Sequence, residues 1–233
     1  MMMKENPGEH RDEMTLYTST VSTCAWRVRI AMELKGLRYT PVAVDLPGGQ
    51  QRESEFAHAS ANRQVPLLEV RLGGVGDLRV RITQSVAICE FLEERNAGCG
   101  LCLLPRDDPV RRARVREVVE TVTSLIQPAQ NRTTVSRVAA VAGAEAADGV
   151  KREAVLSGLH ALERLLAGSA GDFAVGDEVS LADAFVVPQA HASEHVHGLD
   201  VASEAPTVHR VARRAAELPA FRAARGGYTK GDV

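Results

Sequence analysis

The 233-residue sequence has little aromatic character and few cysteines. Phe, Trp and Tyr together make up 4% of the residues, and there are four Cys and a single Trp. Four irregularly spaced cysteines are too few for the disulfide framework of a small secreted protein. We therefore expect free thiols.

No excess of charge of either sign is present. The 28 Lys and Arg residues nearly balance the 30 Asp and Glu residues, which gives a formal net charge of -2 and a sequence pI near 6.4. A chain with this balance has no bulk positive field to attract nucleic acid or an anionic membrane. Neither is an expected partner.

Long apolar runs are also missing. No stretch approaches the ~18 residues of a membrane-spanning helix, and the first residues lack the apolar core of a signal peptide. We expect a cytoplasmic protein with no membrane association.

The composition that remains is that of an ordinary folded protein. Hydrophobic residues account for 45% of the chain and charged residues for 25%, which excludes a disordered chain. The length allows one large domain or two modest ones.

The first half alternates short β-type runs with helical patterns. Residues 1–13 are polar and predict a flexible tail, after which an α/β domain covers 14–96. Val- and Leu-rich runs, separated by Gly and Pro, predict the order β-α-β-α-β-β-α. The expected elements are strand 14–18, helix 24–35, strand 39–45, helix 53–60, strands 66–72 and 78–82, and helix 84–96.

The second half has only helical patterns. A linker at 97–108 leads to an all-helical domain at 109–228, which opens with Pro109, a residue that suits the first turn of a helix. A second helix is expected after the small-residue stretch 139–149 and a third at Ser180. Shorter helices are expected near 207–216 and 219–225.

The segment after the first strand places two hydroxyls and a thiol at a helix start. Ser22, Thr23 and Cys24 precede an apolar helical stripe. Unpaired N–H groups and the helix dipole stabilise an anion at such a position, and a thiolate is such an anion. By local chemistry alone, however, Ser22 or Thr23 is more often a simple N-cap.

The longer string is more specific. Ser22 to Ala31 reads Ser-Thr-Cys-Ala-Trp-Arg-Val-Arg-Ile-Ala, which resembles the signature Ser-Ser-Cys-x-Trp-Arg-Val-Arg-Ile-Ala of the zeta-class glutathione transferases, the maleylacetoacetate isomerase family. Thr23 is the one departure. The resemblance covers 14 to about 225 and implies a thioredoxin-like N-terminal domain, an all-α C-terminal domain, a homodimer and glutathione as cofactor.

The resemblance also implies roles for these residues. Ser22 would donate a hydrogen bond to the glutathione thiolate, Cys24 would lie beside the sulfur, and Thr23 would line the same cofactor site; Ser22 and Cys24 are the expected catalytic residues. A redox role for Cys24 is the alternative. The sequence Cys24-Ala25-Trp26-Arg27 has no second cysteine for a Cys-x-x-Cys dithiol.

Three further segments in the first half match the family's cofactor site. Val65-Pro66 corresponds to a segment whose proline is cis, so Val65 would pair its main chain with glutathione as a neighbouring strand would. Gln84 and Ser85 would hold the γ-glutamyl carboxylate, although Ser85 could be an ordinary N-cap. Gln51 resembles a loop glutamine that contacts glutathione, with a one-residue shift to Gln50 as the alternative.

In the second half, Ile126-Gln127-Pro128-Ala129-Gln130-Asn131 matches a family string. Pro128 should kink the helix. Gln127 and Asn131 would face the cofactor cleft from one side of it, or else be ordinary polar surface. Farther on, Ser180 and Asp183 have the spacing of the capping box that is characteristic of the fold, and this role is structural.

A second departure from the family lies in the second half of the chain. His195 stands where relatives carry an arginine for the substrate's carboxylate, and a neutral imidazole cannot make the bidentate contact of a guanidinium. His191 and His195 have i, i+4 spacing, but no third ligand is apparent, so no metal is expected. Cys99 and Cys102 lie in the linker without a partner pair, and the arginines of 111–116 indicate a solvated helix face.

The implied activity is glutathione-dependent cis-trans isomerisation of a small molecule, maleylacetoacetate, to fumarylacetoacetate. Conjugation of glutathione to small electrophiles is the nearest alternative, and a different thiol cofactor is another. A third is a non-catalytic interaction module, which would not need to keep the residues of the thiol site.

Overall fold

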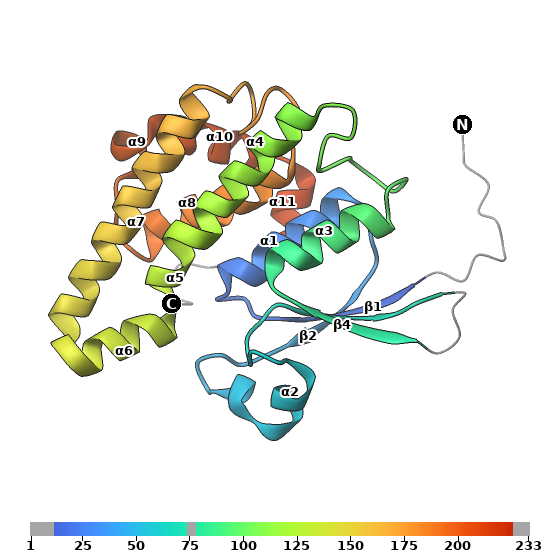
Figure 1. Ribbon diagram of the computed structural model, residues 1–233, viewed down its shortest axis with the longest axis horizontal. Coiled ribbons are helices and arrows are strands. Elements are labelled where there is room, and N and C mark those ends of the chain that lie inside the picture. Colours follow the sequence, from blue (N-terminus) through green and yellow to red (C-terminus); the bar gives the residue numbers. More distant parts are fainter. Residues whose placement is uncertain (1–11, 74–77, 226–233) are drawn as a thin grey trace.

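The computed structural model describes residues 12–73 and 78–225 (Figure 1). Residues 1–11 of the expected tail 1–13 lie outside the described residues, as do 74–77 and 226–233. The first half has the predicted element order. Its elements are β1 (Glu13–Thr18), α1 (Thr23–Leu34), β2 (Thr40–Ala43), η1 (Gln50–Arg52), α2 (Ser54–Ala59), β3 (Leu67–Arg71), β4 (Arg79–Thr83) and α3 (Ser85–Arg95).

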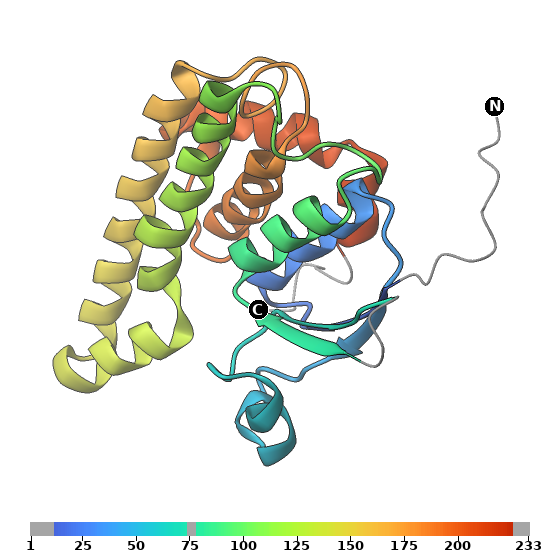
Figure 2. The same ribbon diagram turned by 45° about the vertical axis from the view of Figure 1, so that its right-hand side comes forward.

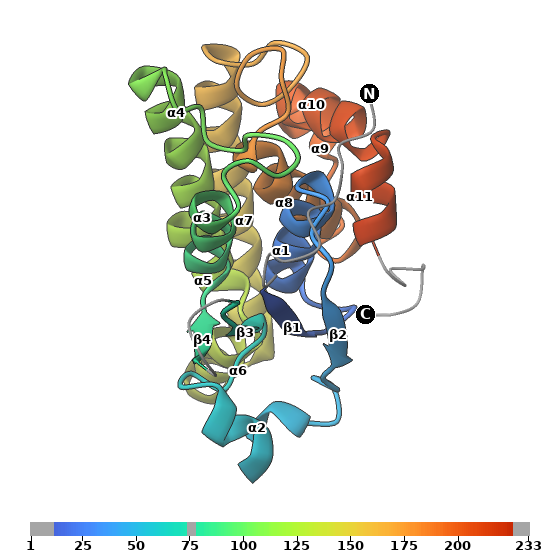
Figure 3. The same ribbon diagram turned by 90° about the vertical axis from the view of Figure 1, so that its right-hand side faces the viewer.

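These elements form a thioredoxin-like layer structure around a mixed sheet of order β2-β1-β3-β4. β1 is parallel to β2 and antiparallel to β3, which is antiparallel to β4. Helices α1 and α3 cover one face of the sheet and α2 covers the other (Figures 1 and 3). The loop between β1 and α1 leaves the sheet at the carboxyl end of β1, and the start of α1 contacts α5 of the second half through Thr23 and Gln127.

Alternation along β3 explains the two covered faces. Leu67 and Leu68 are both fully buried, but Leu68 belongs to the main core under α1 and α3, whereas Leu67 packs with Phe56 of α2. Successive strand residues point to opposite faces. A run of apolar residues in β3 is thus the pattern of a strand covered on both sides.

The second half is helical, as expected. In Figure 2, α4 and α7 form a long pair, with α6 at the end away from α9 and α10. The elements are α4 (Pro109–Glu120), η2 (Thr121–Ile126), α5 (Gln127–Gln130), α6 (Arg132–Ala142), α7 (Ala144–Ala167), α8 (Leu181–His195), α9 (Val201–Glu204), α10 (Pro206–Ala216) and α11 (Pro219–Ala224).

Most predicted bounds differ from the observed ones by one or two residues, and two of the differences have an evident cause. β1 already begins at Glu13, because the adjoining Asp12 is held by Arg95 and by the Gly73 N–H. The stretch 139–149 is helical apart from Gly143, whose φ of 89° separates α6 from α7. Alanine-rich segments favour helix, and a single glycine suffices for the turn.

The capping box is confirmed. Ser180 is the N-cap of α8, and its N–H donates to the Asp183 carboxylate at 2.8 Å. Asp183 also accepts from the Ala174 N–H at 2.8 Å, which ties the preceding loop to the helix. Both side chains are about 1% exposed. The box therefore fixes the start of α8, the helix that packs against α1.

One hydrophobic core joins the two halves. It includes Trp26 and Ile30 of α1, Leu92 of α3, and Phe185 of α8. In the connection between α3 and α4, Leu103 is fully buried and its carbonyl accepts from the Leu181 N–H. No helix of the described residues is long and apolar enough to cross a membrane.

Candidate active site

The start of α1 is capped by Ser22. This residue has extended backbone angles, and its hydroxyl oxygen accepts a hydrogen bond from the Ala25 N–H at 3.1 Å. Within the described part of the chain the N–H groups of Thr23 and Cys24 have no partner. A hydroxyl that accepts one bond still has a proton to donate. Ser22 is thus a cap and a potential donor to an anion at once.

The other two residues of this helix start point in different directions. The Thr23 hydroxyl donates to the side-chain oxygen of Gln127 at 3.3 Å, which links α1 to α5. Cys24 is a free, half-buried thiol in the first turn. The predicted cluster of Ser22, Thr23 and Cys24 therefore offers one hydroxyl and one thiol at the helix start and uses the second hydroxyl for a contact between domains.

Val65 presents main-chain groups that lack partners. The Val65-Pro66 peptide bond is cis, as expected. Val65 is 8% exposed, and neither its N–H nor its carbonyl has a hydrogen-bond partner among the described residues. Buried main-chain groups are normally paired. A peptide that lies alongside Val65 would satisfy both groups.

Gln84 and Ser85 form a constrained helix start. Gln84 has a φ of 72°, which is unusual for a residue other than glycine. Such strain is concentrated at functional sites. Gln84, not Ser85, is the N-cap of α3, and its side chain makes no capping bond. Ser85 is the first helical residue and is 6% exposed, so the alternative of Ser85 as an N-cap is wrong.

The structure distinguishes the two neighbouring glutamines of the η1 loop. The side-chain oxygen of Gln50 accepts from the Asp45 N–H at 2.8 Å and thereby closes the loop. The side-chain oxygen of Gln51 is buried and has no hydrogen-bond partner in the part of the chain that the structure describes. A buried, unsatisfied amide oxygen is costly unless a ligand pairs with it. Gln51 is therefore the better candidate.

Pro128 interrupts the second-half helix in the predicted place. The preceding η2 is a π-helix, in which the Gln127 N–H bonds five residues back to the Val122 carbonyl. Widening of the turn relieves the clash of the proline ring. The prediction that Asn131 shares one side of a helix with Gln127 is wrong. Asn131 has extended backbone angles and is the N-cap of α6, where its side chain accepts from the Thr133 N–H at 2.9 Å.

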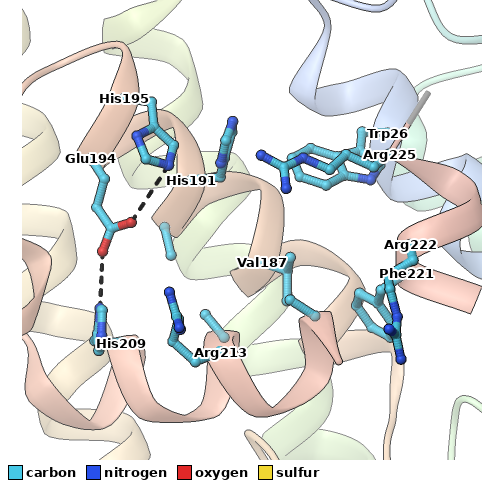
Figure 4. Close-up of a pocket in the computed structure, with 13 residues that line it drawn as sticks. Trp26, Val187, His191, Glu194, His195, His209, Arg213, Phe221, Arg222 and Arg225 are labelled. Carbon is cyan, nitrogen blue, oxygen red and sulfur yellow. Dashed lines mark hydrogen bonds and ion pairs between the residues drawn. The ribbon is translucent and has the colours of Figure 1, made fainter. Parts of the chain in front are cut away.

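A pocket of about 160 Å³ lies between α1, α8, α10 and α11 (Figure 4). Its lining includes His195, His191 and Arg213, together with Arg225 just after α11. Neither Arg213 nor Arg225 has a carboxylate partner among the described residues. Glu194, the one acidic residue in the lining, lies between His195 and His209, with its carboxylate 2.9 Å from His209 Nδ1.

His191 sits between the pocket and α1. Its ring is 5.4 Å from the ring of Trp26, edge to face, and 4.2 Å from that of His195. Burial, together with the neighbouring His195 and Arg225, lowers the pKa of His191 to about 4. His191 is therefore neutral at pH 7 and adds no positive charge to the pocket.

The histidines, the linker cysteines and the basic segment 111–116 can now be placed in the structure. Residues 12–73 and 78–225 contain no group of three or more His, Cys, Asp or Glu side chains that could hold a metal ion. Cys99 and Cys102 are free thiols. In the basic segment, Arg114 pairs with Glu117 and Arg116 with Glu90, in line with a solvated face.

Sequence reasoning missed two sets of cations. Arg27, in the α1 signature, is fully buried and donates to Gln127 at 2.7 Å. Its position four residues after Thr23, on the same face of the helix, was the available signal. Arg213 and Arg225 carry no such signal, because only the packing of α10 and α11 brings them to the pocket.

Comparison with known proteins agrees with this geometry. The model of the glutathione S-transferase N-terminal domain matches residues 21–95, and that of the C-terminal domain matches residues 127–224. The chain is 38% identical over 208 residues to maleylacetoacetate isomerase of Rattus norvegicus, across 88% of this chain and 89% of the relative.

Two solved structures are also similar. Maleylacetoacetate isomerase from Anaeromyxobacter dehalogenans, with GSH bound in the active site, superposes with a TM-score of 0.82 at 36% identity, over 92% of this chain and 95% of the other. The holo structure of a maleyl pyruvate isomerase, a bacterial zeta-class enzyme, has a TM-score of 0.79 at 31% identity, over 90% and 95% of the two chains.

Proposed function

The chain belongs to the maleylacetoacetate isomerase family of zeta-class glutathione transferases, and we propose that it converts maleylacetoacetate to fumarylacetoacetate with glutathione as cofactor. The observation that carries the proposal is the start of α1. There a capping hydroxyl that can still donate its proton stands beside two main-chain N–H groups for which the described part of the chain offers no partner. This arrangement suits a thiolate, the reactive form of glutathione.

Ser22 and Cys24 act at the sulfur. The Ser22 hydroxyl donates to the thiolate while its oxygen continues to cap α1, and the Thr23 and Cys24 N–H groups add the positive end of the helix. Cys24 lies in the first turn, where its side chain can border the sulfur. Bound glutathione supplies a nucleophile that adds to the cis double bond, permits rotation and leaves unchanged.

The remaining predicted residues hold the tripeptide. Val65 pairs its main chain with the cysteinyl part, and the Gln84-Ser85 helix start takes the γ-glutamyl carboxylate. Gln51 offers its unsatisfied amide. Gln127 and Asn131 approach from the second domain, where each still has an amide NH₂ group without a partner among the described residues. The residues of the site thus fit glutathione.

The basic pocket takes the acid end of the substrate. Maleylacetoacetate carries carboxylate groups, and His195 replaces the arginine that the family uses for one of them. Arg213 and Arg225 line the same pocket and pair with no carboxylate of residues 12–73 or 78–225. Each guanidinium can form a charge-assisted pair with a carboxylate. We assign to them the carboxylate contact that the family's arginine makes at the position of His195.

The family assignment also suggests a cellular location, an oligomeric state and a pathway. We propose a cytoplasmic homodimer that acts in tyrosine and phenylalanine breakdown. Val110 and Leu125, 71% and 58% exposed at the two ends of the α4–η2 segment, support a partner surface there. The two domains would divide at 14–96 and 109–228, with 97–108 as the linker.

Product analysis tests the activity. Maleylacetoacetate is incubated with the protein and a small amount of glutathione, and both fumarylacetoacetate and free thiol are measured over many turnovers. Isomerisation predicts full conversion with the thiol unchanged. Loss of thiol in proportion to the product would instead identify a conjugating transferase.

Calorimetry separates the remaining alternatives. Glutathione should bind the wild-type protein, and replacement of Gln84 by Ala should weaken that binding. A protein that binds no glutathione, and no other small thiol, would be the interaction module.

A further inference from the structure

Arg27 is a buried cation in the middle of the α1 signature. Its residue is 0% exposed, its Nη2 donates to the Gln127 side-chain oxygen at 2.7 Å, and its guanidinium carbon lies 4.9 Å from the centre of the Phe185 ring. Its Nε has no hydrogen-bond partner within 12–73 and 78–225. These contacts come from α5 and α8, so Arg27 points into the interface between the two domains.

No carboxylate among the described residues neutralises this charge. The other fully buried cation of α1's neighbourhood, Lys35, has the Glu93 carboxylate 2.8 Å from its Nζ. Arg27 has an amide oxygen and an aromatic face instead. A buried charge is costly unless it is paired. The missing anion must therefore come from a ligand or be tolerated at a loss of stability.

The charge lies close to the start of α1. Arg27 is one helical turn beyond Thr23, and both side chains donate to the same Gln127 oxygen. With a rise of 1.5 Å per residue, the backbone of Arg27 is roughly 8 Å along the axis from Ser22. At an effective dielectric constant of ~20, a unit charge at about this distance changes an ionisation constant by roughly tenfold or more.

Arg27 also orients Gln127. The Gln127 oxygen accepts from Thr23, from Arg27 and, at 3.2 Å, from the Gln130 amide. Gln130 is itself fixed by a reciprocal pair of bonds to the buried Gln189, at 3.0 and 3.1 Å. Because three donors converge on its oxygen, the NH₂ group of Gln127 must point away from them.

We infer that Arg27 is a positioning residue of the thiol site: its unneutralised buried charge favours the thiolate of bound glutathione, and its bond to the Gln127 oxygen fixes the orientation of that amide. This role rests on the proposed function, since it requires glutathione at the start of α1. Arg27 contacts neither the thiol nor the substrate in this arrangement. It nevertheless accounts for part of the thiol ionisation that would otherwise be attributed to Ser22.

The test is the pH titration of glutathione bound to the protein, followed by the ultraviolet absorbance of the thiolate. Arg27→Met should raise the pH of half-ionisation by about one unit. Arg27→Lys keeps the charge and should stay close to wild type, while glutathione binds more weakly because a lysine lacks the guanidinium fork.

Arg29→Met is the matched control. Arg29 is also buried in α1, but it contacts the Ala224 carbonyl and the Thr18 hydroxyl on another face of the helix. Its loss should reduce stability and leave the thiol titration unchanged. An equal shift in this variant would mean that the Arg27 effect reports general damage to α1, and the inference would fail.

Gln127→Glu tests the charge without removing Arg27. A carboxylate at this position would neutralise the guanidinium, so the thiol should ionise at higher pH although the protein folds at least as well. Gln127→Met, which adds no charge, should weaken glutathione binding with a smaller change in titration. This pair remains informative if Arg27→Met does not fold.

The outcomes separate the two proposals. If the wild-type protein binds no glutathione, or binds it with an unshifted thiol, the proposed function is wrong at its first step. The other case is that wild type ionises bound glutathione near neutral pH while both Arg27→Met and Gln127→Glu do so at the same pH. The role inferred for Arg27 is then wrong, and the proposed function stands.

Discussion

The Ser22 hydroxyl oxygen accepts a hydrogen bond from the Ala25 N–H at 3.1 Å, and this contact gives one residue two separable tasks. The oxygen lone pair stabilises α1, whereas the hydroxyl proton is available to a ligand. Capping and catalysis are usually treated as competing explanations of a serine at a helix start. Here the geometry accommodates both.

Replacement of Ser22 should separate these tasks. Ser22→Ala loses the cap and the donor, so the free energy of unfolding should fall by about 0.5–2 kcal/mol and bound glutathione should ionise at higher pH. Ser22→Asp keeps the cap, but it adds negative charge and no proton donor. We expect near wild-type urea denaturation and a still larger loss of thiolate. A normal thiolate titration in Ser22→Asp would contradict the donor role.

The basic pocket predicts a selective effect on substrate. Arg213→Met and Arg225→Met should each raise KM for maleylacetoacetate by about tenfold, the value of one lost charge-assisted hydrogen bond. The Kd for glutathione should not change. Arg210→Met is the control, because Arg210 lies on α10 as Arg213 does but donates to the Gly171 carbonyl outside the pocket. If all three variants behave alike, the pocket does not bind the substrate.

His191 makes stability depend on pH. Its pKa is lowered to about 4 in the folded protein by burial and by His195 and Arg225, against an ordinary value of 6.5. Between these values the unfolded chain binds more protons, so this group's stabilisation is present above pH 6.5 and is lost as the pH falls toward 4.

His191→Gln should therefore flatten the pH dependence of unfolding over this window. The difference in unfolding free energy between wild type and variant, measured by denaturant titration at several pH values, should change steadily from pH 6.5 down to about 4. It should be constant above pH 7. A difference that is the same at all pH values would show that His191 does not titrate as inferred.

The buried pair of Lys35 and Glu93 joins the end of α1 to α3 and to the linker. The ammonium is 2.8 Å from the Glu93 carboxylate, which also accepts from the Leu103 N–H at 3.2 Å. Glu93→Gln leaves the lysine charge buried without its partner and should cost about 3–5 kcal/mol in denaturant unfolding. The half-exposed pair of Arg116 and Glu90 is the comparison, and Glu90→Gln should cost about 0–1 kcal/mol.

Local sequence signals were sufficient to predict the order of helices and strands, the capping box of Ser180 and Asp183, and the helix start at Ser22 to Cys24. Such features depend on residues within about four positions of one another, so their physics can be read from spacing. Boundaries were less secure. Nothing in the stretch 139–149 indicated that Gly143 alone would break the helix.

Contacts between distant segments required the folded chain. The meeting of Thr23 and Arg27 with Gln127 spans about a hundred residues, and its geometry follows from how α5 and α8 pack against α1. The choice of Gln51 over Gln50 and the use of Asn131 as a cap likewise depend on which neighbours satisfy each amide. Spacing can nominate a polar side chain for a site, but the burial and pairing of its atoms determine whether it remains available to a ligand.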